Sequence, residues 1–570
     1  MICLIRPPAV ESFRFATTTI TAPLGLAYIA SAIESVGLSL CVIDAVGLAP
    51  KARTEYFKGF LVGLNSLEIV NRIPTECKLV GISVIFTHEW PIVVDLISKI
   101  RASRSDVTVV LGGEHATAMP EFSLITSGAD FIVLGEGEDT AKELFAALEA
   151  REPTEDITGI AYQNNDQIVV NPRRKRNLDV DNIERPAWHY FNLNAYFEEG
   201  FVGGMSSGYL TVPILATRGC PYQCTYCSSP MMWSPRWIPR DPIKVVDEIE
   251  YYINKYGAHN FPLQDLTAIL KKDWIVQFCN EIIKRKLNIK WLLPTGTRAE
   301  AVDFEVAKLL KDSGMVSMAY APESGSVLTR KYVKKKMKDE NLFGSIRAAV
   351  GAGLNVSIFL VIGFPHDKPE HIGENLIFID RLINENIKDL SVGYYMALPG
   401  TELFHSLYDS GKIKIDRQYF SHILDSLSLG LPQSYSSSMS SFNLMLWKFR
   451  MFRRFYANSQ KKKDGRKFVF NILEIIKGIG TNSHESRLQT AVLNGLRSGL
   501  TTLAVRFKSR WLSKQAEKEM FSNWDNEYRR TRIEKISLGV VEEQSVDTKH
   551  LCESNVIESL KREQSIKYSI

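Results

Sequence analysis

Short apolar runs alternate with segments of helical periodicity along the first 150 residues. Each apolar run is bounded by Gly, Pro or polar residues, and the intervening segments repeat apolar positions every three to four residues. This alternation is typical of an open, doubly wound parallel sheet with helices on both faces. Such sheets bind ligands beyond the carboxyl ends of their strands, so we expect one ligand site along that edge. The expected strands are residues 1–5, 40–44, 79–85, 107–113 and 131–137, and the expected helices are residues 24–36, 91–101 and 140–149.

Residues 151–208 have a different character. The sequence ITGIAYQNNDQIVVNP places two β-forming runs on either side of the polar residues Asn164 to Asp166, which predicts a hairpin. A Pro-containing stretch follows the hairpin. We therefore expect a linker that contains a small hairpin.

A second alternation of strands and helices occupies residues 209–415. Six expected strands in series, spaced roughly 35 residues apart and separated by five expected helices, predict a parallel barrel or partial barrel. The chemistry of such a barrel lies at the carboxyl ends of its strands. The expected strands are residues 211–217, 259–265, 289–295, 316–324, 355–364 and 389–397, and the expected helices are residues 242–255, 274–285, 303–313, 341–352 and 369–384.

Residues 416–570 are expected to be mostly helical and basic. The sequence MLWKFRMFRRFYANSQKKK and the stretch from Leu496 to Phe521 combine apolar and basic faces at helical spacing. Two interpretations are open: contact with an anionic membrane surface or a hydrophobic substrate, or a helical cap on the open side of the barrel. We favour the cap. The last thirty or so residues are predicted to be poorly ordered.

Composition narrows the function classes. The chain has 570 residues, of which 45% are apolar and 23% charged, and a net charge of +5 that is too small to predict nucleic-acid binding. No window is long and apolar enough to predict a membrane span. The first residues, MICLIRPP, do not resemble a secretory signal, so a cytoplasmic location is expected.

Three of the eight cysteines are close in the sequence. Cys220, Cys224 and Cys227 lie in ATRGCPYQCTYCSSP, directly after the first expected barrel strand. Three thiolates can hold a four-iron cluster and leave one iron open to a ligand. A zinc site would need a fourth ligand nearby, and neither His189 nor Cys279 has zinc-like spacing.

The CxxxCxxC spacing, with Tyr226 before the third cysteine, resembles the radical S-adenosylmethionine (SAM) superfamily. That resemblance implies that SAM chelates the open iron and that one-electron reduction yields a 5'-deoxyadenosyl radical. It also implies that Tyr226 lies near the adenine. The protein would position the reactants and exclude water.

Polar residues follow the later barrel strands. Glu323 is the best candidate to accept hydrogen bonds from the ammonium or ribose hydroxyls of SAM. A salt bridge within the barrel rim is the less favoured alternative for Glu323 or Arg298. The strand-end loops at Gly363 to Pro365 and Leu398 to Thr401 also match related radical enzymes. The candidate SAM contacts are Tyr226, Gln264, Asp265, Arg298, Glu323 and Ser324.

The series PPAV, APLGLAYIASAIE, LGGEHATAMPE and LGEGE resembles the cobalamin-binding domain of cobalamin-dependent radical SAM enzymes, a likeness that extends over residues 1–410. Glycines let the backbone approach a flat macrocycle, and the helix that starts at Leu24 can receive a polar group at its amino end. Turns without a ligand are the simpler alternative for each glycine. The candidate cobalamin contacts are Pro23, Leu24, Gly25, Gly112, Gly113, Glu114, His115, Gly135, Glu136 and Gly137.

The DxHxxG signature that supplies a histidine to cobalt in other cobalamin proteins is absent. His115 is therefore not assigned as a cobalt ligand, and Phe86, His88 and Trp90 are candidate residues beneath the macrocycle. In the family that the sequence resembles, an unligated cobalt favours methyl transfer over mutase chemistry.

The resemblance implies a methyltransferase that acts on an unactivated carbon of a small-molecule or lipid substrate and receives electrons from a flavodoxin or ferredoxin. It would release S-adenosylhomocysteine and 5'-deoxyadenosine. Two alternatives remain: an oxidative cyclase resembling the anaerobic cyclase of chlorophyll biosynthesis, and a non-catalytic corrinoid-binding module. The sequence does not identify the substrate.

Overall fold

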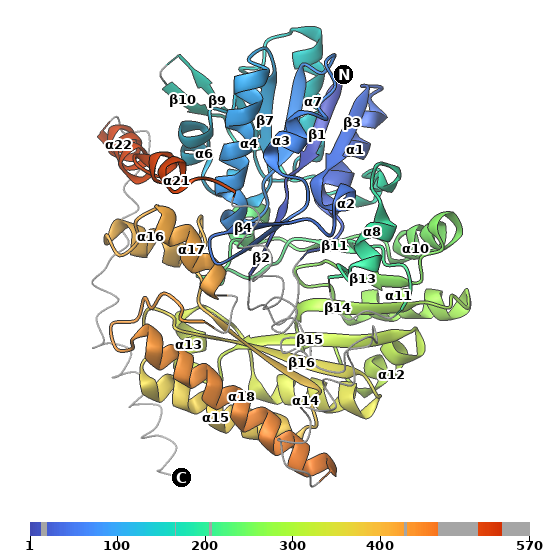
Figure 1. Ribbon diagram of the computed structural model, residues 1–570. Helices are drawn as coiled ribbons and strands as arrows, with labels where there is room; N and C mark the ends of the chain where they lie inside the picture. Colours follow the sequence, from blue (N-terminus) through green and yellow to red (C-terminus); the bar gives the residue numbers. More distant parts are fainter. Residues whose placement is uncertain (13–19, 166, 204–207, 427–429, 465–510, 538–570) are drawn as a thin grey trace.

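The computed structural model describes residues 1–12, 20–165, 167–203, 208–426, 430–464 and 511–537. Two α/β domains follow one another, with the first domain above the second in Figure 1, and helices complete the chain. This confirms the fold class expected from the sequence. Among the described residues, none of the helices combines the length and apolarity that crossing a bilayer requires.

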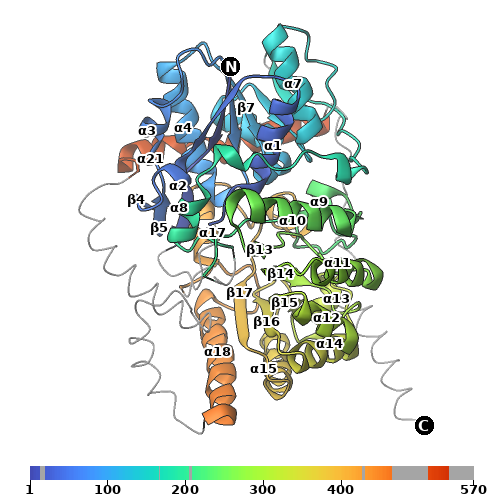
Figure 2. The same ribbon diagram turned by 90° about the vertical axis from the view of Figure 1, so that its right-hand side faces the viewer.

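The first domain is built on a seven-stranded sheet in the order β10-β9-β8-β7-β6-β1-β3. Successive side chains of β1 enter opposite cores, Leu4 on one face and Ile5 on the other, as the period of a strand requires. Helices α1 and α7 cover one face and α3, α4 and α6 the other (Figure 2). The parallel strands are β1 (Ile2–Arg6), β3 (Leu40–Asp44), β6 (Leu79–Ser83), β7 (Thr108–Gly112) and β8 (Phe131–Val133), and the helices are α1 (Leu24–Ser35), α3 (Ser66–Val70), α4 (Trp90–Ser103), α5 (Glu114–Ala118), α6 (Pro120–Ser127) and α7 (Glu138–Ala150).

The hairpin expected in the linker is present as β9 (Ile160–Asn164) and β10 (Gln167–Val170), but it belongs to the first sheet. Strand β9 pairs antiparallel with β8, which would otherwise expose an unpaired edge. The first sheet therefore continues to Val170. A small antiparallel sheet that the sequence did not predict lies beside it, formed by β2 (Ala9–Ser12), β5 (Gly59–Val62) and β4 (Arg53–Tyr56).

The second domain contains a parallel sheet in the order β13-β14-β15-β16-β17, and residues 211–214 add parallel bridges to β13. These six segments are the six expected strands. Helices on the outer face separate them (Figures 1 and 2). The strands are β13 (Asn260–Pro262), β14 (Lys290–Thr297), β15 (Met315–Glu323), β16 (Asn355–Ile362) and β17 (Asp389–Tyr394), and the helices are α10 (Pro242–Tyr256), α11 (Lys272–Lys284), α12 (Phe304–Asp312), α14 (Asp339–Gly351) and α15 (Pro369–Asn384).

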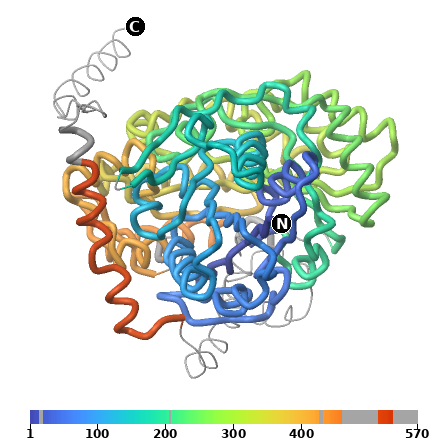
Figure 3. The backbone as a smooth tube through the Cα atoms, turned by 90° about the horizontal axis from the view of Figure 1, so that it is seen from above, coloured from blue at the N-terminus to red at the C-terminus, as the bar shows by residue number. Residues whose placement is uncertain are grey.

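The carboxyl-terminal helices cover both domains. Helix α18 (Ser441–Asp464) packs along α15 and β17, where Arg454 donates two hydrogen bonds to Asp380, at 2.7 and 2.6 Å. The basic and apolar segment around Trp447 is thus a cap on the barrel, as favoured from the sequence. Helix α22 (Trp524–Ser537) instead packs against α6 of the first domain, and its Arg532 pairs with Asp409 at 2.8 Å (Figure 3). Helix α21 (Lys514–Met520) carries Glu517, which pairs with Arg417 at 2.6 Å. Residues 496–510 and 538–570, which carried further expectations, lie outside the described residues.

Candidate functional site

The cysteine loop connects β11 (Thr217–Arg218) to the short helix α9 (Ser229–Trp233). Its first residue, Gly219, has a φ of +81°, and a Cβ there would overlap the carbonyl oxygen of Arg236, so the turn requires glycine. The three cysteines that follow are half-buried free thiols. The Cys227 amide donates to the Cys224 carbonyl at 3.1 Å, which folds the loop back on itself.

Asp265 positions the strand that leads into this loop. Its buried carboxylate accepts hydrogen bonds from the amides of Thr217 and Ala216, the latter at 3.2 Å. Burial raises the pKa of Asp265 to about 6, although these hydrogen bonds favour the ionised form. The structure therefore gives Asp265 a positioning contact with the backbone, whereas the sequence suggested a contact with SAM.

The cysteine loop is also held from its other side. The Thr225 amide donates to the Val333 carbonyl at 3.2 Å, and the Thr225 carbonyl accepts from the Leu403 amide at 3.0 Å. Segments far apart in the sequence therefore fix the path between the second and third cysteines.

A buried ion pair lies next to the thiols. Glu323, at the end of β15, accepts a hydrogen bond from Lys335 at 3.0 Å, and both side chains are almost enclosed. Glu323 has a φ of +65°, an uncommon conformation for a residue with a side chain. Burial raises the pKa of the Cys224 thiol, and the Lys335 ammonium acts in the opposite direction. Lys335 is a site residue that the sequence did not reveal, because it lies within a run of lysines.

Tyr226 lies in the same region. Its hydroxyl interacts with the Glu323 carboxylate, and burial raises its pKa well above the usual value. The ring meets Phe364, which follows β16, edge-on at 5.5 Å between centroids. Burial also raises the pKa of the neighbouring Cys227 thiol to about 12.

The remaining candidate SAM contacts differ in how many protein partners their side chains have. The side-chain nitrogen of Gln264 is buried and has no hydrogen-bond partner among the described residues, so it is available to a ligand. Arg298 stacks over Tyr222 at 4.0 Å and pairs with Glu300 at 2.8 Å. Ser324 is buried in the turn after β15 and contacts Asn375 at 3.3 Å.

The turn after β7 brings the first domain to the cysteine loop. The Glu114 carboxylate accepts a hydrogen bond from the hydroxyl of Ser228, the residue that follows Cys227. Burial raises the pKa of Glu114. His115, the next residue, instead enters the core, where its ring lies 4.9 Å from that of Trp90 and burial lowers its pKa to about 3. The absence of a histidine signature for cobalt agrees with this placement.

The glycines in this turn have different surroundings. Gly113 has a φ of +118°, and a Cβ there would lie 2.5 Å from the carbonyl oxygen of Val84. A Cβ on Gly112 would lie 3.8 Å from Cβ of Val133, an ordinary contact. Only Gly113 is therefore required by the backbone itself.

We expect Gly113→Ala to lower the free energy of unfolding by about 2 kcal/mol and to reduce bound corrinoid, because both the positive φ and the carbonyl of Val84 oppose a Cβ. Gly112→Ala is the matched control and should change stability by less than about 0.5 kcal/mol. Denaturant unfolding and the absorbance of bound cobalamin measure both quantities. Equal stability losses in the two variants would contradict this assignment.

The turn after β8 forms a second contact between the domains. Glu136 pairs with Arg176 at 2.9 Å and with Arg218 of β11 at 3.4 Å. Gly135 lies across from helix α9, since a Cβ there would be 3.8 Å from the Met232 carbonyl oxygen. Gly137 packs closely against Ile29. Glu136 therefore links the first domain to β11 through its ion pair with Arg218.

The other residues named for the first domain lie as follows. Pro23 is buried, Leu24 begins α1, and Gly25 is exposed with open space beside it. Phe86 is exposed after β6 and stacks on the buried His88 ring at 5.4 Å. Trp90 is fully buried and cannot form a surface beneath a ligand, so Phe86 is the exposed ring of the three.

Neither alternative fourth ligand contacts the three thiols. His189 pairs with the exposed Glu34 at 3.2 Å, and Cys279 is buried on α11. The structure does gather three other cysteines that the sequence left apart, because Cys3 and Cys41 are paired in register and the sulfurs of Cys41 and Cys77 are 4.0 Å apart. These lie on β1, on β3 and just before β6, away from the cysteine loop.

Two family models match the chain in the order of its domains. The model described as B12 binding domain matches residues 16–145, and the one described as Radical SAM superfamily matches residues 214–379. The first match includes the glycine turns after β7 and β8. The second includes the cysteine loop and Glu323.

Three curated relatives are similar to much of the chain. An uncharacterized methyltransferase of Pyrococcus horikoshii is 26% identical over 405 residues, which are 71% of this chain and 82% of the relative. Cytidylyl-2-hydroxyethylphosphonate methyltransferase of Streptomyces wedmorensis is 27% identical over 390 residues, covering 64% and 72%. Anaerobic magnesium-protoporphyrin IX monomethyl ester cyclase of Cereibacter sphaeroides is 30% identical over 313 residues, covering 53% and 49%.

Two solved structures share the fold. The cobalamin-dependent SAM radical enzyme OxsB with aqua-cobalamin bound superposes with a TM-score of 0.59 at 15% identity, covering 95% of this chain and 82% of that chain. The radical SAM methyltransferase TsrM of Kitasatospora setae, with cobalamin and a [4Fe-4S] cluster bound, gives 0.57 at 18% identity, covering 73% and 75%. At these identities the likeness establishes the architecture alone.

Proposed function

Because this chain belongs to the cobalamin-dependent radical SAM enzymes, we propose that it transfers a methyl group to an unactivated carbon of a small-molecule or lipid substrate. Its cofactors are a [4Fe-4S] cluster, SAM and cobalamin. Two relatives with methyltransferase names, which it matches over 82% and 72% of their lengths, support transfer of a methyl group.

The observation that carries the proposal is that the glycine turns of the first domain adjoin the cysteine loop. Glu114 contacts Ser228, and Glu136 contacts Arg218, so both turns lie against the segment that contains the three thiols. Ligands held by the two domains would therefore share one space between them. Methyl transfer from a corrinoid to a carbon radical requires such proximity.

The residues present fit the proposed cofactors. Three half-buried thiols on one loop suit an iron-sulfur cluster, and Lys335 offsets their negative charge. Glu323 and the unpartnered Gln264 side chain offer an acceptor and a donor to SAM. When bound, these groups supply a 5'-deoxyadenosyl radical and a transferable methyl group. The side chains named here bind, orient and exclude water.

An external one-electron donor such as a flavodoxin or ferredoxin would supply the reducing electron. We propose that the enzyme works in the cytoplasm, together with such a donor. A membrane surface is not needed for the basic segment of α18, since that helix is committed to α15 and β17.

The test is anaerobic reconstitution with iron, sulfide and hydroxocobalamin, followed by reduction with dithionite in the presence of SAM labelled in its methyl group. We expect 5'-deoxyadenosine, S-adenosylhomocysteine and label on the corrinoid, even before the substrate is known. Deoxyadenosine without label on the corrinoid would contradict methyl transfer and favour the cyclase alternative, to which the cyclase relative points. Failure to cleave SAM in a cluster-loaded preparation would favour a non-catalytic corrinoid-binding module.

A further inference from the structure

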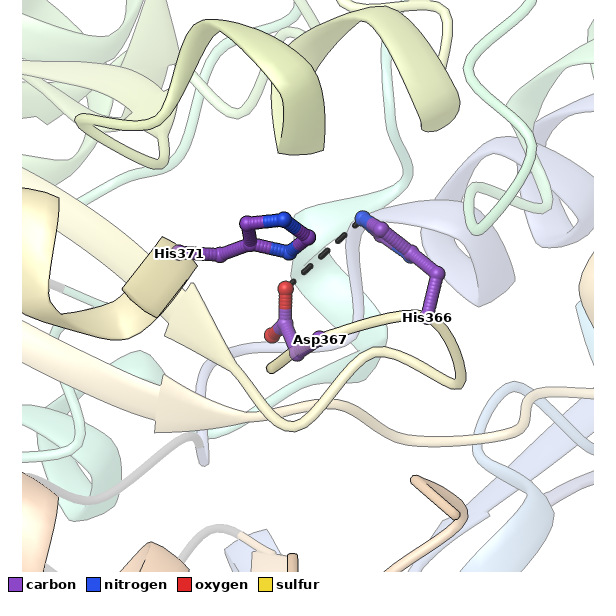
Figure 4. A group of neighbouring side chains, drawn as sticks. All are labelled: His366, Asp367 and His371. Atoms are coloured by element: carbon purple, nitrogen blue, oxygen red, sulfur yellow. Dashed lines mark ion pairs between the residues drawn. The ribbon is translucent and has the colours of Figure 1, made fainter. Parts of the chain in front are cut away.

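Two histidines and an aspartate converge at the carboxyl end of β16. His366 and Asp367 lie in the loop after the strand, and His371 lies in the first turn of α15 (Figure 4). One potential ligand atom from each residue lies within 4.8 Å of those of the other two. The sequence marked only the preceding Gly363 to Pro365 as a strand-end loop, so this cluster has no role in the function proposed above.

The carboxylate of Asp367 is firmly oriented. One oxygen accepts hydrogen bonds from the amides of Gly363 and Phe364, at 2.9 and 3.0 Å. The other oxygen accepts from the Thr329 hydroxyl at 3.0 Å and faces His366. A carboxylate held in this way by neighbouring donors is typical of a metal ligand.

His366 is the unusual member of the cluster. Both of its ring nitrogens are buried, and neither has a hydrogen-bond partner among the described residues. The ring stacks on Tyr332 at 3.5 Å between centroids, which fixes its plane. Because neither nitrogen is engaged, the ring can offer a lone pair to a ligand. An unpartnered buried imidazole is costly unless a ligand satisfies it.

The spacing between the side chains suits an ion. Nε2 of His366 lies 3.7 Å from Oδ1 of Asp367, which is too long for a hydrogen bond. Ligand atoms about 2.0–2.2 Å from a common metal lie roughly 2.8–3.6 Å apart at octahedral or tetrahedral angles. A small closure would therefore bring both atoms to one ion. The ring of His371 is turned toward the same point, and its Nδ1 accepts a long hydrogen bond of 3.4 Å from the Lys368 amide, as an unprotonated nitrogen does (Figure 4).

We propose that His366, Asp367 and His371 bind one divalent transition-metal ion, of the zinc or ferrous class, and leave its remaining coordination positions open. Imidazole nitrogens select such ions over magnesium or calcium, which prefer oxygen ligands throughout. The site would stand beside the reaction space, because the ring of Phe364 lies between those of His366 and Tyr226, 6.0 and 5.5 Å away. The open positions would bind an oxygen of the substrate, from a carboxylate, phosphate or hydroxyl group.

The experiment is a zinc titration of the anaerobic holoenzyme. The enzyme is first loaded with cluster and cobalamin, so that the cluster cysteines are occupied. A chelator then removes loosely bound metal before zinc is added. We expect one zinc ion per chain, and at least a hundredfold weaker binding in His366→Ala and in His371→Ala, since loss of even an outer-shell partner costs about 10- to 100-fold. His189→Ala, which removes an exposed histidine elsewhere, is the matched control and should bind zinc as the unaltered enzyme does.

Iron and corrinoid contents of each variant report whether it has folded, and His366→Gln provides a second variant of similar size if the alanine variant is unstable. X-ray absorption at the zinc edge should show nitrogen and oxygen ligands with imidazole scattering. Sulfur ligands would assign the zinc to Cys3, Cys41 and Cys77 and overturn the proposal, as would equal zinc affinity in the unaltered enzyme and both histidine variants.

Discussion

Cys224→Ala should reduce bound iron from about four atoms per chain to less than about one and abolish reductive cleavage of SAM, while bound cobalamin stays near one per chain. A [4Fe-4S] cluster held by only two thiolates is not retained, because the other atoms of the cysteine loop are not soft ligands and cannot replace the lost sulfur. The glycine turns that would hold the corrinoid belong to the first domain, whose sheet and cores do not include Cys224. Iron analysis, cobalamin absorbance and deoxyadenosine assay measure the three quantities.

Cys41→Ala is the matched control, because it removes another half-buried thiol, from the first domain. It should keep iron and SAM cleavage at the unaltered level. Loss of iron in Cys41→Ala to the same extent as in Cys224→Ala would contradict the assignment of the cluster to the cysteine loop. Loss of cobalamin together with iron in Cys224→Ala would show instead that the two domains bind their cofactors as one unit.

The sequence predicted those parts of the fold that follow from local periodicity. The expected helix at residues 369–384 is α15 with the same bounds, and the expected strand at residues 40–44 is β3. A cobalamin-binding domain followed by a radical SAM domain, expected from the glycine series and the cysteine spacing, is confirmed by the two family models, which match in that order. Both kinds of prediction use residues that are close in the chain.

Pairings between distant segments were not predictable in this way. The hairpin at β9 and β10 was recognised, but its partner β8 was not, because an edge strand carries no mark of what will pair with it. The three short strands β2, β4 and β5 are too brief to show periodicity. The cysteines at positions 3, 41 and 77 meet only because parallel strands bring them into register.

The roles of charged site residues depended on partners far along the chain. Asp265 follows β13 and Glu323 ends β15, yet Asp265 binds backbone amides and Glu323 binds Lys335. Glu136 lies between two glycines, a position typical of a residue that contacts a ligand. It nevertheless pairs with Arg218, which is 82 positions away in the sequence. The contacts of these residues with SAM or cobalamin stay predictions, since a strand-end carboxylate has the same sequence signature in either role.

Arg218→Ala should lower the free energy of unfolding by about 3–5 kcal/mol, because it removes the cation that pairs with the nearly enclosed Glu138. Glu136 would keep only its ion pair with Arg176. Only 4% of the Arg218 side chain is exposed, and it lies 2.5 Å from Glu138 and over the ring of Tyr28. Burial disfavours the charged form, but the two carboxylates outweigh it and raise the pKa of Arg218. Since Arg218 precedes the cysteine loop and contacts the first domain, the variant should also lose iron. Denaturant unfolding and iron analysis measure the effects.

The matched control for Arg218→Ala is Arg347→Ala, which removes an arginine whose side chain is 60% exposed and pairs with Glu385 at 2.9 Å. Water already solvates that pair, so the control should lose less than about 1 kcal/mol. Arg218→Lys should recover only part of the stability, because an ammonium lacks the planar, forked donors with which a guanidinium reaches two carboxylates at once. If Arg218→Ala proved as mild as Arg347→Ala, the contact between the glycine turn and the cysteine loop would not be a buried ionic one. A shared space for both cofactors would then lack its buried ionic contact between the domains.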